Sequence, residues 1–207
     1  MNPKMMRNLL LAGSLAFSAS ALAVSSSISF GVTSGNHGPG ADMLSNACAG
    51  CHGTHGSSVG SAPTISGMTE DYFLEAMEEY KNGERPATIM DRIARGYSDD
   101  EINAMAGWFA KKPFGRAAQA HDAEKAAKGE RLHKKYCEKC HEDGGRLADG
   151  NSVLAGQSIP YLRYSMEDFL SEARHMPRKM KRRIGRLVKK EGNDGIEAVV
   201  QYYGSQQ

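Results

Sequence analysis

The pattern Cys-x-x-Cys-His occurs twice in this chain, as CAGCH at residues 48–52 and as CEKCH at residues 137–141, and it uses all four cysteines. Two thiols with this spacing lie on one turn of a helix, and an imidazole follows them directly. Each segment must therefore fold so that two sulfurs and a ring nitrogen lie close enough to bind the same group.

Three kinds of chemistry use closely spaced thiols, and the spacing separates them. Zinc sites made of two Cys-x-x-Cys pairs usually place them about 15–20 residues apart, whereas 85 residues lie between these pairs. A redox disulfide normally lies on a strand-to-helix turn, which this sequence does not predict. Cys-x-x-Cys-His is the attachment signature of c-type haem, in which the thiols add to the vinyl groups and the histidine ligates the iron.

The motifs therefore predict two covalently bound haem c groups. Two large apolar groups would also fill the cores of two small domains with few aromatic residues. The predicted attachment residues are Cys48, Cys51, His52, Cys137, Cys140 and His141.

The offset of 89 residues that relates the two motifs also relates Gly40 to Gly129 and Arg85 to Arg174. Near the two ends, residues 98–110 align with residues 192–204 at an offset of 94. The second copy has therefore gained five residues after Arg174. A long self-similar stretch of this kind predicts two copies of one small domain.

The pattern of apolar residues predicts helices and no strand of useful length. The apolar residues of segment 72–80 share one helical face. Ser98 and Glu101 form a capping-box sequence at the start of another helix. We expect an all-α fold, with domains at 40–112 and 127–207 joined by a linker at 113–126.

Residues 1–23 have the composition of a secretory signal peptide, with Lys4 and Arg7 before an apolar run and the small residues Ala21 and Ala23 at its end. The apolar run falls short of a bilayer span, so no membrane anchor is predicted. Residues 24–39 are rich in Ser and Gly, which predicts a flexible segment. We therefore expect a periplasmic protein.

The predicted mature chain has 24 basic and 24 acidic side chains and is formally neutral. This balance gives no reason to expect nucleic acid as a partner. Nine of the basic residues lie between Arg174 and Lys190. This run is either a solvated helix face or a surface that steers an acidic redox partner.

A six-coordinate haem needs a second axial ligand, and methionine raises the reduction potential relative to a second histidine. In the first copy, Met90 lies 38 residues after His52, just before the capped helix. Met68 follows a glycine turn too closely, and Met77 falls in a stripe of core residues. We expect Met90 to be the ligand.

In the second copy, Met180 lies 39 residues after His141, and Met176 lies 35 residues after it. The spacing favours Met180, with Met176 as the alternative. Met residues that do not ligate are expected to fill the core.

Two further expectations concern the surroundings of the haem histidines. Pro63 lies eleven residues after His52, a position similar to the one at which small c-type cytochromes often use a proline carbonyl to accept the N–H of the haem histidine, and this resemblance implies the same bond here. Ser152 stands at the matching position of the second copy. His133 is expected at the surface or in the linker.

Several segments of the chain resemble a known family from Asp42 to the C-terminus. They read NACAGCHGTHGSSVG, ATIMDRIARGYS, KKYCEKCHEDGG, LAGQSIPYLRYSMEDF and YYGSQQ. The chain is similar to the dihaem cytochrome subunit of flavocytochrome c sulfide dehydrogenase and, more broadly, to dihaem cytochromes of the c4 type.

This resemblance implies two tandem class I cytochrome c domains and an FAD-containing flavoprotein partner in a heterodimer. The flavoprotein would oxidise sulfide, and the electrons would pass through this chain to a soluble cytochrome or similar acceptor. The matching positions imply that His52, Met90, His141 and Met180 are the iron ligands. No glycine-rich flavin fingerprint occurs in the chain itself, so no catalytic residue is predicted.

Two alternatives remain at this point. The chain is either part of such a complex or a free-standing dihaem carrier of the c4 type. A dihaem peroxidase is disfavoured because it needs an open iron position, and both copies offer a well-placed methionine.

Overall fold

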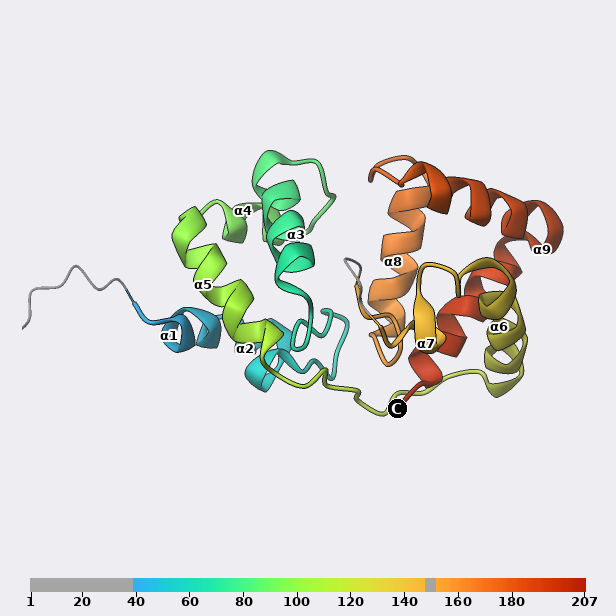
Figure 1. Cartoon of the computed structure of the whole chain (residues 1–207), viewed down its shortest axis with the longest axis horizontal. Helices are drawn as coiled ribbons and strands as arrows, with labels where there is room; N and C mark the ends of the chain where they lie inside the picture. Colours follow the sequence, from blue (N-terminus) through green and yellow to red (C-terminus); the bar gives the residue numbers. More distant parts are fainter. Residues whose placement is uncertain (1–38, 148–151) are drawn as a thin grey trace, which may run out of the picture. The chain divides into compact units, whose positions relative to one another are not determined.

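The computed structural model describes residues 39–147 and 152–207. The predicted signal peptide and nearly all of the expected flexible segment lie outside these residues. Helices form all of the regular structure within the described ranges, and no strand occurs there (Figure 1). This confirms the all-α prediction. No helix in the described part is both long enough and apolar enough to cross a bilayer.

The first half contains five helices and one short 3₁₀ turn. These elements are α1 (Ala41–Asn46), α2 (Ala49–His52), η1 (Thr54–Gly56), α3 (Glu70–Asn82), α4 (Met90–Ala94) and α5 (Asp99–Ala110). Helix α5 opens with the predicted capping box, since Ser98 and Glu101 each accept a hydrogen bond from the backbone N–H of the other. This arrangement satisfies two N–H groups that a helix start would otherwise leave unpaired.

The second half contains α6 (Ala123–Tyr136), α7 (Glu142–Gly145), α8 (Ile159–Leu170) and α9 (Arg178–Ser205). Helix α6 begins inside the segment expected as a linker. Helix α9 is two helical segments joined at Gly192, which has φ 67° and ψ −166°. Glycine tolerates this positive φ because it has no Cβ.

The repeat is visible in the order of the elements (Figure 1). By sequence offset, α3 matches α8, and α5 matches the segment of α9 after Gly192. The short helix α4 therefore matches the longer segment of α9 that precedes Gly192. The five inserted residues lie between Arg174 and this glycine, where they lengthen a helix.

Each half has its own apolar core. In the first half, α3 packs on α5, and the rings of Phe73 and Phe109 stack with centroids 5.5 Å apart. In the second half, α6 packs on α9 through Leu132, Leu187 and Val199, which are all buried. Packing apolar helical faces against each other accounts for most of the stability of such small helical units.

Gly129 allows α6 and α9 to approach closely. A Cβ atom at this position would lie 1.9 Å from the carbonyl oxygen of Ala198 and 2.7 Å from Cβ of Tyr202. No side chain fits there without moving one helix. Gly40, the repeat equivalent in the first half, stands just before α1.

Hydrogen bonds also join the two halves. The side-chain amide of Gln157 accepts from the backbone N–H of Thr64 and donates to its carbonyl, each at 2.9 Å. Arg85 donates to the hydroxyl of Tyr161 at 2.6 Å and to that of Tyr72 at 3.2 Å. Tyr72 and Tyr161 are repeat equivalents, so equivalent positions of the two copies meet, as in an isologous dimer.

We expect Gly129→Ala to lower the free energy of unfolding by about 1–3 kcal/mol, because the added methyl group overpacks the α6–α9 contact. Gly185→Ala is the matched control. It lies in the same pair of helices, and its Cβ would meet no atom within 4 Å. This control should be neutral or stabilising by about 0.5–1 kcal/mol. Guanidinium unfolding of the haem-loaded protein measures both, and equal effects would contradict the close approach.

Candidate haem sites

The first motif occupies a single helical turn. Cys48 precedes α2, and the backbone N–H of His52 donates to the carbonyl of Cys48 at 2.9 Å. Neither thiol is in a disulfide; Cys48 is half-buried and Cys51 is exposed. Gly53, with φ 76°, ends the turn. The two sulfurs are therefore presented together and remain free to form thioethers.

His52 is buried and oriented by the backbone. Its Nδ1 lies 2.8 Å from the carbonyl oxygen of Pro63. A carbonyl only accepts, so Nδ1 carries the hydrogen and Nε2 presents its lone pair. Burial also lowers the pKa of His52, although the bond to Pro63 opposes this shift. The expected role of Pro63 is confirmed, and the imidazole is neutral, as a metal ligand must be.

The second motif repeats the turn with a different environment. The backbone N–H of His141 donates to the carbonyl of Cys137 at 3.1 Å. Burial lowers the pKa of His141 to about 4, with a smaller contribution from His133, and burial raises the pKa of Cys137 to about 11. Both groups are therefore uncharged at neutral pH.

Nδ1 of His141 is buried and has no hydrogen-bond partner among the described residues. Ser152, at the position that matches Pro63, directs its hydroxyl to the carbonyl of Val153 instead. Because Ser152 stands where the first half has Pro63, the ring of His141 lacks, among the described residues, the kind of hydrogen bond that orients His52.

These features fit covalent haem at both motifs. Each motif offers two unpaired thiols within one turn and a neutral histidine next to them. Ile89 and Ile93 flank Met90 and are 43% and 38% exposed, so they offer an apolar surface of the kind that a porphyrin covers. No three His, Cys, Asp or Glu side chains converge anywhere in residues 39–147 or 152–207, so the geometry offers no zinc cluster.

The methionines differ in burial in a way that bears on the axial ligands. Met90 is the first residue of α4 and is half-buried at the edge of the first core. Met68 and Met77 lie inside that core, at 4% and 5% exposure. A ligand must reach the haem rather than fill the core, so this contrast supports Met90, which stays a prediction.

The second half shows the same contrast. Met180 is half-buried in the first turn of α9 and packs at the edge of the second core, as Met90 does in the first. Met176 is buried within that core, before Pro177. The setting of Met180 matches that of Met90 more closely, and its assignment likewise stays a prediction.

The expectation for His133 was wrong. It is fully buried on α6, where Nδ1 lies 2.8 Å from the hydroxyl of Tyr203 and Nε2 contacts the carboxylate of Glu138. The matching residue in the first half is Leu44, which is also buried. That correspondence was the signal available in the sequence, because repeat equivalents share their place in the core.

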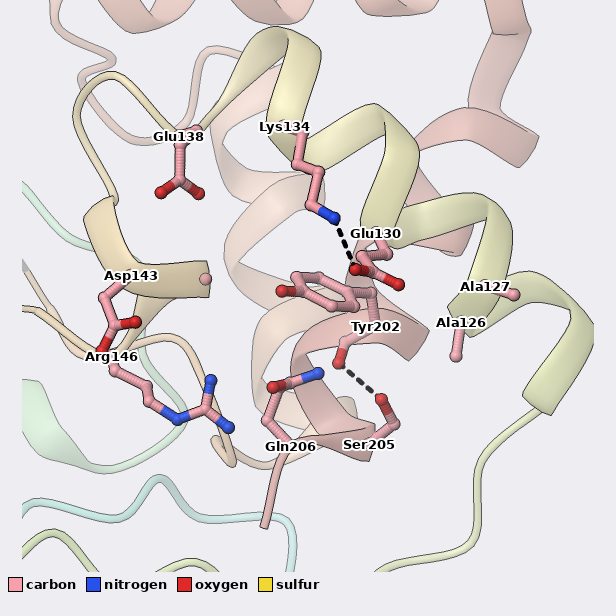
Figure 2. A pocket seen from close by; sticks show the side chains of 11 residues that line it. Ala126, Ala127, Glu130, Lys134, Glu138, Asp143, Arg146, Tyr202, Ser205 and Gln206 are labelled. Atoms are coloured by element: carbon pink, nitrogen blue, oxygen red, sulfur yellow. Dashed lines mark hydrogen bonds and ion pairs between the residues drawn. The ribbon is translucent and has the colours of Figure 1, made fainter.

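A hollow of about 590 Å³ lies among α6, α7 and the end of α9 (Figure 2). Its lining mixes both signs of charge, and on its α6 wall Lys134 donates to Glu130, one turn away, at 2.7 Å. None of the predicted attachment residues or axial methionines lines it. It is therefore separate from the haem chemistry, although Glu138 on its wall also reaches His133.

Comparison with known proteins places the chain among cytochromes. Residues 39–111 match the family model for cytochrome c. The cytochrome subunit of sulfide dehydrogenase from Chlorobaculum tepidum is 44% identical over 68 residues, which span 33% of this chain and 62% of that relative. The thiosulfate dehydrogenase electron acceptor of Stutzerimonas stutzeri is 29% identical over 180 residues, which span 80% of this chain and 82% of that relative.

A solved structure shows the same fold. Reduced recombinant cytochrome c4 from Pseudomonas stutzeri superposes with a TM-score of 0.68 at 24% identity, over 82% of this chain and 100% of that one. The likeness extends across both halves, as the repeat predicted.

The fold and the two sites define a c-type cytochrome with two tandem class I domains, each carrying one covalently bound haem c. Residues 39–111 match the cytochrome c family, and the chain is similar to the cytochrome subunit of sulfide dehydrogenase, a thiosulfate dehydrogenase electron acceptor and cytochrome c4. The resemblance seen in the sequence is confirmed.

We expect Met90→Ala to abolish the weak near-infrared iron–sulfur band of one haem and to lower its reduction potential, because the thioether ligand is lost. Met77→Ala is the control, since it removes a buried methionine from the core of the same half. It should reduce stability but leave the band. A band that survives Met90→Ala would remove Met90 as a ligand.

Met180→Ala and Met176→Ala should affect the second haem unequally. Met180→Ala should remove its near-infrared band, whereas Met176→Ala should leave the band and lower the free energy of unfolding by about 2–5 kcal/mol, as for a buried methionine. Absorbance and redox titration of both variants decide between them. Loss of the band only in Met176→Ala would reverse the assignment.

Proposed function

We propose that this chain is the electron-transfer subunit of a periplasmic sulfide-oxidising complex. It would take electrons from an FAD-containing flavoprotein subunit and deliver them to a soluble acceptor. The observation that carries this proposal is the 44% identity to the cytochrome subunit of a sulfide dehydrogenase, in a chain with two complete attachment motifs.

The chemistry of the chain explains why it needs a partner. Its four cysteines are all committed to attachment, so none is spare for reaction with sulfur. No glycine-rich strand–turn–helix sequence for a flavin nucleotide occurs in it. Oxidation of sulfide therefore belongs to another subunit, and this chain removes the electrons.

Each haem, when bound, supplies a one-electron centre, and two such centres match the two electrons released when one sulfide is oxidised to elemental sulfur. The chain's residues set the conditions. Burial lowers the pKa of both His52 and His141, which keeps their imidazoles neutral. Methionine as the second ligand, from Met90 and Met180, would raise both potentials and favour acceptance of electrons.

A free-standing carrier is the second candidate. It is favoured by the relation to a thiosulfate dehydrogenase electron acceptor over 80% of this chain, and by the structural likeness to the whole of a cytochrome c4 chain. Such a carrier would meet its donor only transiently and would not hold a flavoprotein subunit.

Gentle purification of the native protein at low salt distinguishes the two. The visible spectrum is recorded before and after sulfide is added, and flavin is measured in the same fraction. Reduction of both haems by sulfide together with co-purifying flavin is expected for the complex. Two haems without flavin and without a response to sulfide would establish the free carrier, with haem reduction by ascorbate as the control that the centres are intact.

A further inference from the structure

The two halves carry opposite net charge, although the predicted mature chain is formally neutral. Residues 40–112 contain eleven acidic and six basic side chains, which gives a net charge of −5. Residues 127–207 contain eleven acidic and sixteen basic side chains, which gives +5. A partner with a charged surface is therefore attracted to one half and repelled by the other.

Most of the excess positive charge lies on the segment of α9 before Gly192. It carries eight basic residues and one acidic residue, Glu191, which is paired with Lys128 at 3.3 Å. The basic residues are Arg178, Lys179, Lys181, Arg182, Arg183, Arg186, Lys189 and Lys190.

Part of this segment and the end of α6 enclose a hollow of about 570 Å³. We call it the basic groove. Five of its six lining side chains are cations, and none of the five forms an ion pair with any described residue. The lining residues are Lys135, Tyr136, Arg183, Arg186, Lys189 and Lys190. Unpaired cations gathered around a depression leave a strong positive field that an anionic surface can neutralise.

The basic groove lies next to the second haem attachment motif. Tyr136 immediately precedes Cys137, and Nη1 of Arg183 lies 3.5 Å from the carbonyl oxygen of Lys135. A partner seated in the groove would thus be placed beside the second haem.

The first half has no counterpart of the basic groove. The residues that match Lys135 and Tyr136 are Asn46 and Ala47, and the matching helix is the five-residue α4. The five inserted residues lie in the lengthened, basic segment of α9. The groove is therefore specific to the second copy of the domain.

We propose that the basic groove docks the acidic face of a soluble redox protein that takes electrons from the second haem. This inference rests on the proposed electron-transfer function and adds the exit surface and the charge of the acceptor. Permanent subunit interfaces have apolar cores, but this lining consists of long, solvated cations around one tyrosine. Such a surface suits a brief encounter that is steered by charge and ends quickly.

The test compares two variants that change the net charge by the same amount. Arg186→Glu with Lys189→Glu reverses two cations of the groove, whereas Lys111→Glu with Lys112→Glu reverses two cations that follow α5 in the first half. None of these residues belongs to an attachment motif or is a candidate ligand. Visible spectra and unfolding midpoints confirm that both haem-loaded variants are folded.

Stopped-flow mixing measures the second-order rate of electron transfer from the reduced protein to an oxidised, acidic single-haem cytochrome, at low and high salt. The wild-type rate should fall steeply as salt increases. The groove variant should be about tenfold slower at low salt and nearly insensitive to salt, because the steering field is lost. The control variant should stay close to wild type, and a basic single-haem cytochrome should not react more slowly with the groove variant.

An equal loss of electron-transfer rate in both variants would overturn the proposal, since the change in net charge alone would then explain it. So would an unchanged rate in the groove variant, or a wild-type rate that is slow and independent of salt. If the groove variant instead loses adsorption to phosphatidylglycerol vesicles while its electron-transfer rate is kept, the groove binds a membrane surface and the proposal fails. Reduction by sulfide is measured separately, so either inference can fail without the other.

Discussion

The structure depends on a constraint set by one helical turn in each half. Two thiols and an imidazole must be presented together, and the imidazole must be neutral with one nitrogen free. Burial keeps His52 neutral, and the carbonyl of Pro63 fixes which of its nitrogens is free. The helices around each turn form a small core of their own, and much of the apolar surface beside Met90 remains uncovered by protein. The domains are thus built to be completed by their prosthetic groups.

Much of the fold and of the haem sites was predictable from the sequence, because residue type and spacing along the chain decide these features. The capping box at Ser98 and Glu101 follows from residue type and spacing, whereas the acceptor role of Pro63 was implied by the resemblance to small c-type cytochromes, and both are present. The burial of His133 was missed because histidine is usually polar and exposed, whereas here two partners satisfy both ring nitrogens. The basic groove could not be predicted from the run of cations alone, because it also needs Lys135 and Tyr136 from a helix 50 residues earlier. Tertiary placement, rather than local pattern, creates it.

The duplication shows how two copies of one domain acquire different properties. The first half orients its histidine through a backbone carbonyl, whereas the second leaves Nδ1 of His141 without a described partner and places a polar cluster of His133, Tyr203 and Glu138 nearby. Hydrogen bonding around a haem and its ligands tunes its potential. These differences therefore give the two haem sites distinct settings.

The amide of Gln157 bonds both the N–H and the carbonyl of Thr64, a residue of the other half. Separating the halves would break both hydrogen bonds at once and expose these groups to water, and each such bond contributes about 0.5–1.5 kcal/mol. These bonds therefore favour the arrangement in which the two halves stay associated. Because electron tunnelling weakens with distance, contacts that hold the two halves together also bear on how fast electrons could pass between haems bound at the two motifs.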